Sequence, residues 1–148
     1  MNVEDIIKTK SEIPLPTRTV IHLSLVSNKL NELMAQALKP FEVSLQQFNV
    51  LRILRGQKGA PANLSTLNSR MVSKMSNTTR LVDKLIQKGY VKRNICAANR
   101  RKVEIFITEV GAAVLSEMDV AMKHAEQTAI KNFTKKELRE LNNLLDKF

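Results

Sequence analysis

Residues 71–111 read MVSKMSNTTRLVDKLIQKGYVKRNICAANRRKVEIFITEVG, and two different periodicities meet in this stretch. Up to Gly89, apolar residues recur at steps of three and four, and Gly89 stands where the glycine that ends a helix is expected. From residue 91 to 108, apolar and polar residues alternate on both sides of a short turn, which is the pattern of a β-hairpin. The stretch therefore predicts a helix that begins near residue 74 and a hairpin directly after it.

The predicted helix has two unlike faces. Its inward face carries apolar and small side chains at helical spacing, namely Met75, Thr78, Leu81, Val82 and Leu85. Its other face is polar and basic, and consists of Lys74, Ser76, Asn77, Arg80, Lys84 and Lys88. The hairpin tip is predicted to carry a second polar and basic group, Asn99, Arg100, Arg101 and Lys102.

The positive charge of the chain is concentrated in this region. The 148 residues have a formal net charge of +10, from 24 Lys and Arg against 14 Asp and Glu. Between Arg70 and Lys102 there are ten basic residues and one acidic residue, Asp83, so this window holds almost the whole excess. Such a concentration indicates a surface that binds a polyanion.

The residues before this region predict three more helices. A helical pattern runs over residues 17–39 and stops at Pro40, while Pro14 and Pro16 indicate that residues 1–16 form a non-helical leader. Ser44 and Gln47 have the spacing of a capping box at the start of the next helix. That helix is expected to turn Leu45, Phe48, Leu51, Ile53 and Leu54 inward and to end near Gly56, and a short helix is expected over residues 63–71.

Two helices are predicted after the hairpin, a long one and a final amphipathic one, with Thr108 and Thr134 as candidate caps. Hydrophobic residues make up 43% of the chain and charged residues 26%, which is ordinary globular composition. The expected fold class is therefore mainly α with a small β-hairpin (α+β), in a single domain of residues 1–148.

The order of a short helix, a tight turn, a polar second helix and a basic hairpin is that of a winged helix-turn-helix. A helix fits the major groove of DNA, and arginine is favoured in the negative potential of a narrow minor groove. We therefore predict that the second helix reads the major groove and that the hairpin is a wing beside it. The predicted DNA-binding residues are Lys74, Ser76, Asn77, Thr79, Arg80, Lys84, Arg93, Asn99, Arg100, Arg101 and Lys102.

The same stretch resembles the core of the MarR family of bacterial transcriptional regulators. The recognition-helix pattern of that family, TR, two apolar residues, D, K or R, and L, is found at residues 79–85. The turn into the wing, KG, an aromatic residue, V, any residue and R, is found at residues 88–93, and the exit pattern, L or I, T, two residues and G, at residues 107–111. LQQFNVLRIL, at residues 45–54, matches the helix upstream.

The wing departs from the family at one position. Where the family has Asp-x-Arg, this chain has Asn99, Arg100 and Arg101. In the family, the aspartate is thought to orient the wing arginine. Asn99 still offers an acceptor to Arg101, but without the charge that strengthens the hydrogen bond.

The resemblance implies a homodimer in which residues 17–39 and 109–148 are dimerisation helices and about 44–107 form the DNA-binding region. The long apolar stripes of the terminal segments also favour a dimer, with packing inside one chain as the alternative. Two-fold symmetry predicts a pseudo-palindromic operator on double-stranded DNA. The resemblance further implies repression as the commoner output and, in many members, release by a small aromatic or phenolic effector.

The sequence gives little support to other classes of function. His22 and His124 are far apart, and no nucleophile motif, metal-ligand cluster or phosphate-binding glycine loop accompanies them, so no enzyme, cofactor or metal is predicted. No segment has the length of a membrane span or the pattern of a secretory signal, and a cytoplasmic location is expected. A non-specific nucleic-acid-binding protein remains the alternative, although the basic window offers only Tyr90 for stacking on bases.

Two single residues raise questions about regulation. Cys96 is the only cysteine, and the nearby Lys92 and Arg93 would favour its thiolate, so a redox sensor is a second alternative to an inert strand residue. His22 is a candidate lining residue of an effector cleft, against the simpler prediction of a structural histidine.

Overall fold

The computed structural model describes residues 1–72, 77–96 and 99–148, and gives only the backbone for Cys96 and residues 99–102. In chain order the elements are α1 (Val3–Ile7), α2 (Leu15–Leu38), the 3-10 helix η1 (Lys39–Phe41), α3 (Leu45–Gly56), α4 (Leu64–Arg70), α5 (Thr78–Gln87), β1 (Val91–Cys96), β2 (Asn99–Ile107), α6 (Glu109–Ile130) and α7 (Lys135–Leu145). The predicted fold class, mainly α with a small β-hairpin, is confirmed.

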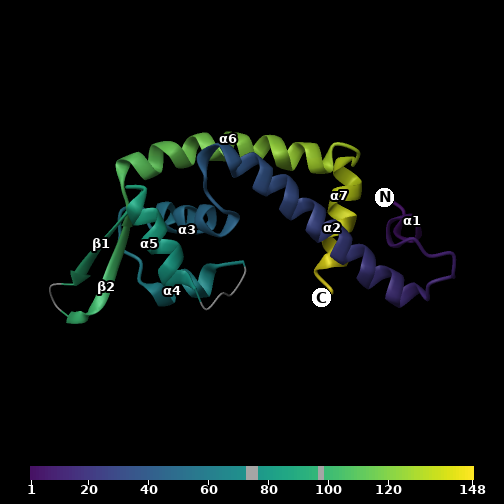
Figure 1. Cartoon of the computed structure of the whole chain (residues 1–148), viewed down its shortest axis with the longest axis horizontal. Helices are drawn as coiled ribbons and strands as arrows, with labels where there is room; N and C mark the ends of the chain where they lie inside the picture. Colours follow the sequence, from purple (N-terminus) through teal and green to yellow (C-terminus); the bar gives the residue numbers. More distant parts are fainter. Residues whose placement is uncertain (73–76, 97–98) are drawn as a thin grey trace.

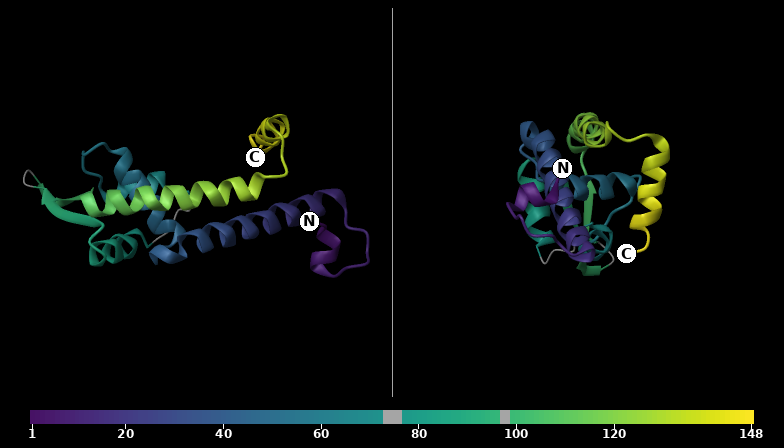
Figure 2. Two further views of the ribbon diagram at one scale, coloured as in Figure 1. Left: turned by 90° about the horizontal axis from the view of Figure 1, so that it is seen from above. Right: turned by 90° about the vertical axis from the view of Figure 1, so that its right-hand side faces the viewer.

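The molecule is elongated, and its two ends are built differently (Figure 1). At one end α3, α4, α5 and the hairpin lie together. From there α2 and α6 run side by side toward the other end, where α1 and α7 lie (Figure 2). The helix that was predicted to read DNA is therefore far along the molecule from the two terminal helices.

The main hydrophobic core lies at the end that holds the hairpin. Each of five elements contributes a fully buried side chain to it: Leu51 from α3, Leu67 from α4, Leu85 from α5, Ile105 from β2 and Leu115 from α6. Burying a side chain of this size stabilises the fold by roughly 1.5–3 kcal/mol. The core thus fixes α5 to the hairpin and to the start of α6.

The start of α3 confirms the predicted capping box. The backbone N–H of Ser44 donates to Gln47 Oε1 at 2.9 Å, and the backbone N–H of Gln47 donates to Ser44 Oγ at 3.2 Å. Of the predicted inward residues, Phe48, Leu51 and Leu54 are buried and Leu45 and Ile53 are partly buried. Val50 is fully buried as well, because α3 packs against α2, α5, α6 and β2 and so buries more than one stripe.

The prediction of a non-helical leader over residues 1–16 is wrong. Asn2 caps α1 by accepting a hydrogen bond from the Asp5 N–H at 3.2 Å, and Val3 is fully buried. Helix α2 begins at Leu15, so Pro16 lies in its first turn. Proline is tolerated there because the first turn of a helix leaves its N–H groups without intrahelical partners.

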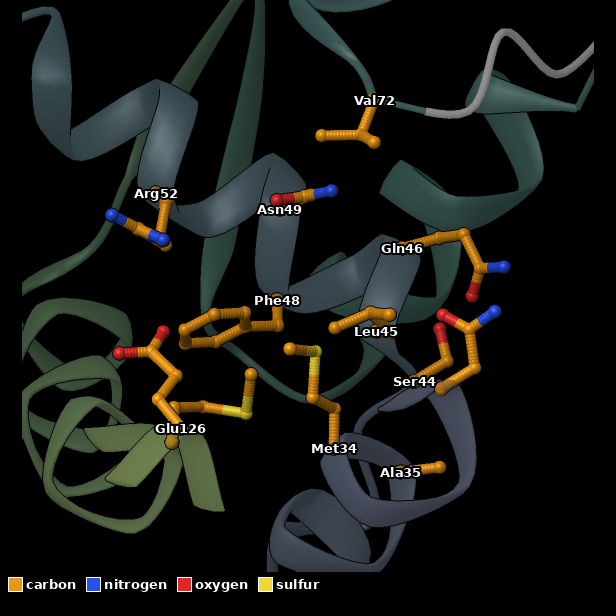
Figure 3. Close-up of a pocket in the computed structure, with 12 residues that line it drawn as sticks. Met34, Ala35, Ser44, Leu45, Gln46, Phe48, Asn49, Arg52, Val72 and Glu126 are labelled. Carbon is orange, nitrogen blue, oxygen red and sulfur yellow. The ribbon is translucent and has the colours of Figure 1, made fainter. Parts of the chain in front are cut away.

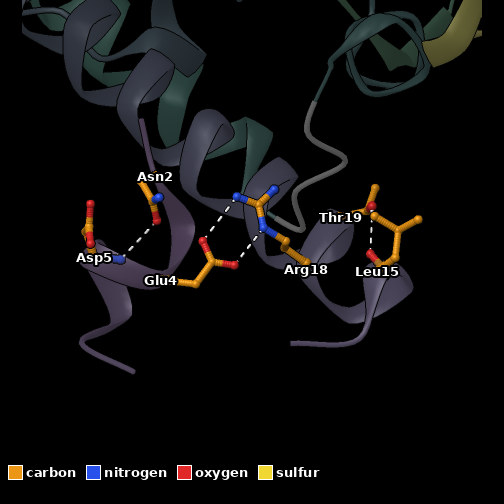
Figure 4. Close-up of polar contacts among 6 residues, drawn as sticks. All are labelled: Asn2, Glu4, Asp5, Leu15, Arg18 and Thr19. Carbon is orange, nitrogen blue, oxygen red and sulfur yellow. Dashed lines mark hydrogen bonds and ion pairs between the residues drawn. The ribbon is translucent and has the colours of Figure 1, made fainter. Parts of the chain in front are cut away.

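An ion pair holds α1 against α2 (Figure 4). The Arg18 guanidinium donates to both carboxylate oxygens of Glu4, at 2.7 and 3.1 Å. This hydrogen bond holds the pKa of Glu4 below its usual value. The N-terminal segment is thus attached to the long helix by a charged pair as well as by Val3.

The hairpin is a two-stranded antiparallel sheet with one irregularity. Its register runs from Val91 opposite Ile107 to Ile95 opposite Val103, and then shifts so that Cys96 lies opposite Asn99. The predicted tip residues 99–102 lie within β2, and of these four Asn99 is paired, with Cys96. Ala62 forms an isolated antiparallel bridge with Ile105, which ties the α3–α4 connection to the sheet.

The terminal helices leave much apolar surface uncovered in the single chain. Thr108 caps α6 and Thr134 caps α7, as predicted, but α7 has no buried residue. Most of the large apolar side chains exposed in the described part of the chain come from the leader, α2 and the segment after residue 119. They include Leu15, Val20, Val120, Phe133, Leu141, Leu144, Leu145 and Phe148. Among the described residues, no helix is long and apolar enough to cross a lipid bilayer.

Candidate nucleic-acid interface

Helix α5 divides its residues between core and solvent as the sequence predicts. Val82 and Leu85 are fully buried, and Thr78 is buried. Asn77, Thr79, Arg80 and Lys84, which were predicted to bind DNA, are all exposed. One end of the molecule therefore presents a polar and cationic helix face while the opposite face of the same helix lies in the core.

Contacts at its first turn position α5 against α4. The Thr78 hydroxyl donates a hydrogen bond to Asn68 Oδ1, which joins the two helices of the helix-turn-helix. Asn77 occupies the N-cap position, but among the described residues its side chain makes no capping hydrogen bond. Asn77 is thus at the cap position with an exposed side chain.

A tight junction joins α5 to the hairpin and to α6. Gly89 has φ of 74°, the left-handed conformation that glycine adopts at helix ends. Thr108 Oγ1 donates to the Gly89 carbonyl at 2.7 Å, and the Thr108 N–H donates to the Tyr90 carbonyl at 3.0 Å. The helical backbone at Gly111 approaches Tyr90 so closely that a Cβ there would lie 2.1 Å from the Tyr90 carbonyl oxygen. Three elements are therefore locked together at this point.

The hairpin carries one predicted site residue with a described side chain, Arg93. The Arg93 guanidinium lies 2.9 Å from the Asp83 carboxylate, so it joins β1 to the exposed edge of α5. Next to it, the Lys92 ammonium lies 5.5 Å from the centroid of the Phe106 ring. Sequence reasoning did not pair Asp83 with Arg93, although Asp83 was conspicuous as the single acid of the basic window.

The remaining predicted site residues fall outside this description. Lys74 and Ser76 lie outside the described residues, and the side chains of Asn99, Arg100, Arg101 and Lys102 are likewise outside them. The backbone of residues 99–102 places these four residues on β2, at the end of the hairpin away from α6. Their DNA contacts stay predictions, as does the redox alternative for Cys96.

A pocket whose lining residues the sequence did not predict lies between α2, α3 and α6 (Figure 3). Its volume is about 600 Å³, and its wall combines apolar and polar side chains: Asn31, Met34, Ala35, Ser44, Leu45, Gln46, Phe48, Asn49, Arg52, Val72, Met122 and Glu126. The Arg52 guanidinium carbon lies 5.7 Å from the Phe48 ring centroid. His22, the candidate lining residue, is half-buried in α2 and does not line this pocket.

The region that forms this interface matches known proteins. A model of the MarR family matches residues 43–103, which run from the residues before α3 into β2. The chain is 28% identical over 136 residues to the multiple antibiotic resistance protein MarR of Escherichia coli, with 90% of each chain covered. The chain is therefore similar to the MarR family in this region and to E. coli MarR along most of its length.

Other transcriptional regulators also match along most of their length. The HTH-type transcriptional regulator PecS of Dickeya dadantii is 28% identical over 133 residues, covering 88% of this chain and 79% of PecS. A crystal structure of a cysteine-to-serine mutant of E. coli MarR, complexed with operator DNA, aligns with a TM-score of 0.76 and 26% identity, covering 99% of this chain and 98% of that one. The predicted function, a transcriptional regulator, is confirmed, and the relatives are regulators rather than enzymes.

Proposed function

We propose that this protein is a MarR-type homodimer that binds a pseudo-palindromic operator in double-stranded DNA and represses transcription there. The observation that carries the proposal is the division of α5, whose Val82 and Leu85 lie in the core while Thr79, Arg80 and Lys84 face solvent. A helix with one anchored face and one hydrogen-bonding face has the form that enters a major groove.

Each part of the exposed face has a role in this proposal. Arg80, near the start of α5, has the fork of donors that recognises guanine in the major groove. Lys84, one turn later, is placed to contact a phosphate, which adds affinity without sequence information. The cations of residues 100–102 lie on the neighbouring hairpin, which reaches toward the minor groove.

The proposed dimer rests on the apolar surface at the other end of the molecule. In α7, Leu141, Leu144 and Leu145 are between 38% and 58% exposed, although they form one stripe on the helix. Uncovered apolar surface of this extent marks an association surface. A second copy of the chain, with its own α2, α6 and α7, covers that surface, and the residues from α3 to β2 remain available for DNA.

Substitution of Arg80 tests the proposed reading of sequence. Arg80→Ala is expected to lower affinity for the operator by about 10- to 100-fold, because a bidentate contact to a base is worth about 1–3 kcal/mol. Affinity for random duplex should fall much less. The measurement is fluorescence anisotropy with a fragment selected from genomic DNA and with a random duplex, over a salt series.

Arg139→Ala is the matched control, because it removes the same charge from the exposed polar face of α7. It should leave both affinities nearly unchanged. A wild-type protein that binds operator and random duplex equally well contradicts the proposal and favours a non-specific nucleic-acid-binding protein. Equal losses on both duplexes in Arg80→Ala contradict the assignment of Arg80 to a base.

We also propose that the pocket between α2, α3 and α6 binds an aromatic carboxylate as an effector. The Phe48 ring and the thioethers of Met34 and Met122 suit an aromatic ring, and Arg52 suits its carboxylate. Helices α2 and α6 belong to the proposed dimerisation region and α3 to the DNA-binding region. A ligand that binds better to one arrangement of these regions changes the affinity for DNA.

Arg52→Gln tests this regulation. For wild type, a panel of benzoates and hydroxybenzoates at millimolar concentration is expected to contain acids that weaken operator binding by roughly 5-fold or more. In Arg52→Gln that weakening should largely disappear, while operator affinity without acid stays the same. Anisotropy with and without each acid measures both quantities. An unaltered response in the variant, or no response of wild type to any acid, contradicts the proposal.

A further inference from the structure

Asp83 is an acid in a place where binding to a polyanion favours cations. It lies on α5 between Val82 and Lys84, three residues after Arg80, and is the only acid between Arg70 and Lys102. Its side chain is 44% exposed, and it lies one helical turn after Thr79 and Arg80, on the helix face proposed to contact DNA. A carboxylate there repels phosphates and by itself weakens binding to DNA.

In the structure this acid pairs with an arginine of the hairpin. Asp83 Oδ1 lies 2.9 Å from a guanidinium nitrogen of Arg93, which is the third residue of β1. Both side chains are more than two-fifths exposed, and ion pairs as exposed as this one contribute little to folding stability, about 0.2–1 kcal/mol. Stability alone is therefore a poor account of a pair that opposes DNA binding by its acidic half.

The pair joins the hairpin to α5 at the level where β2 is anchored in the core, since the fully buried Ile105 lies opposite Arg93. The base of the hairpin is held by the Thr108–Tyr90 hydrogen bond and by the bridge between Ala62 and Ile105. Beyond Arg93, β1 continues to Cys96, and a strand advances about 3.3 Å per residue, so the cationic end lies roughly 10 Å further out. A two-stranded hairpin is marginally stable by itself. A small rotation about the base therefore moves the far end of the hairpin several times further than it moves the base.

We propose that Asp83 and Arg93 form a positioning pair that fixes the wing at one angle to the recognition helix. The inference deepens the proposed function and rests on it. Arg93 then acts through Asp83 rather than through a phosphate, which changes the role predicted for it from the sequence. The pair lowers general affinity for DNA and raises selectivity, because only one wing geometry lets helix and wing contact their grooves together.

Replacing Asp83 with asparagine distinguishes a purely electrostatic role from a positioning role, because the two roles predict opposite changes in operator affinity. Asp83→Asn adds one unit of positive charge to the interface, so a purely electrostatic surface would bind every duplex more tightly. The positioning pair predicts the opposite for the operator, a loss of about tenfold. Random duplex should be bound as tightly as before or slightly more tightly. Anisotropy titrations with both duplexes measure the ratio of the operator affinity to the random-duplex affinity directly.

The salt dependence of DNA affinity tests the role of Arg93. Arg93→Gln should lower operator affinity by the same factor as Asp83→Asn and leave the slope of log affinity against log salt unchanged. An arginine that neutralised a phosphate would reduce that slope by about one when removed. The double variant Asp83→Asn with Arg93→Gln should be no weaker than either single variant, and the exchanged pair Asp83→Arg with Arg93→Asp should recover part of the loss.

Asp119→Asn is the matched control. Asp119 on α6 pairs with Arg55 on α3 at 2.5 Å, and the two side chains are 37% and 40% exposed, much as in the wing pair. This control makes the same charge change without touching α5 or the hairpin, and it should not lower operator affinity. Circular dichroism confirms that all variants are folded.

The possible results separate the two proposals. If wild type does not prefer the operator, the proposed function fails and the positioning pair with it. If wild type prefers the operator and Asp83→Asn binds it equally well or better, only the positioning pair is overturned. A reduced salt slope in Arg93→Gln, or losses that add in the double variant, also overturn it.

Discussion

Replacing Leu141 and Leu145 with glutamate is expected to convert the protein to folded monomers that bind a two-half-site operator about 10³-fold more weakly. The chain does not use these residues for its own core, since α7 has no buried residue and both leucines are already exposed. In a dimer, however, the substitutions place four carboxylates in an apolar interface, where unpaired charges are strongly unfavourable. Losing the second recognition helix removes the gain from linked binding, which is typically 10²–10⁴.

Light scattering measures the mass of the double variant, and anisotropy measures its affinity for the operator. Arg139→Glu is the matched control, because it makes the same change of two charge units on the exposed polar side of α7. The control should remain a dimer and bind the operator with little change. If the double leucine variant remained a dimer with full affinity, α7 would lie outside the interface.

Gly111→Ala is expected to destabilise the fold by roughly 3 kcal/mol or more, the upper end of the range for overpacked sites. A Cβ at this position would lie 2.1 Å from the carbonyl oxygen, 2.8 Å from the carbonyl carbon and 2.9 Å from the Cα of Tyr90. All three are backbone atoms, so no side-chain rotation relieves the overlap. Alanine favours a helix over glycine by only about 1 kcal/mol, which does not offset this cost.

Urea unfolding at a fixed protomer concentration measures the effect, since the stability of a dimer depends on concentration. Gly56→Ala is the control, because Gly56 ends α3 and a Cβ there would meet nothing within 4 Å. We expect the control to be neutral or slightly more stable than wild type. Equal stability of Gly111→Ala and wild type would show that the start of α6 is not locked against the end of α5.

The parts of the fold that the sequence predicts well depend on neighbours in the chain. Four of these features act within a few residues of themselves. They are the Ser44–Gln47 capping box, the caps at Thr108 and Thr134, and the glycine after α5. Side-chain alternation predicts the hairpin in the same way. Element type and order are therefore accessible without tertiary information, and the exposed face of α5 follows from its helical period.

The parts that the sequence does not predict depend on contacts between distant elements. Asp83 and Arg93 are ten residues apart, and their pairing follows only once the hairpin folds back beside α5. The lining of the pocket comes from α2, α3 and α6 together. Tyr90 precedes the hairpin and Gly111 follows it, so the two residues approach each other only after the hairpin has folded. Helix α1 was missed for a different reason, because the two prolines were assumed to exclude helix from the whole leader, whereas Asn2 begins a short helix well before them.

Footprinting on an operator selected from genomic DNA tests the central claim most directly, with the amount of protein bound to each duplex measured in the same samples. The proposed homodimer predicts two protected half-sites with centres about 34 Å apart, one turn of the double helix, occupied together by two protomers. A single protected half-site bound by one protomer, or no protected duplex even at low salt, would contradict it.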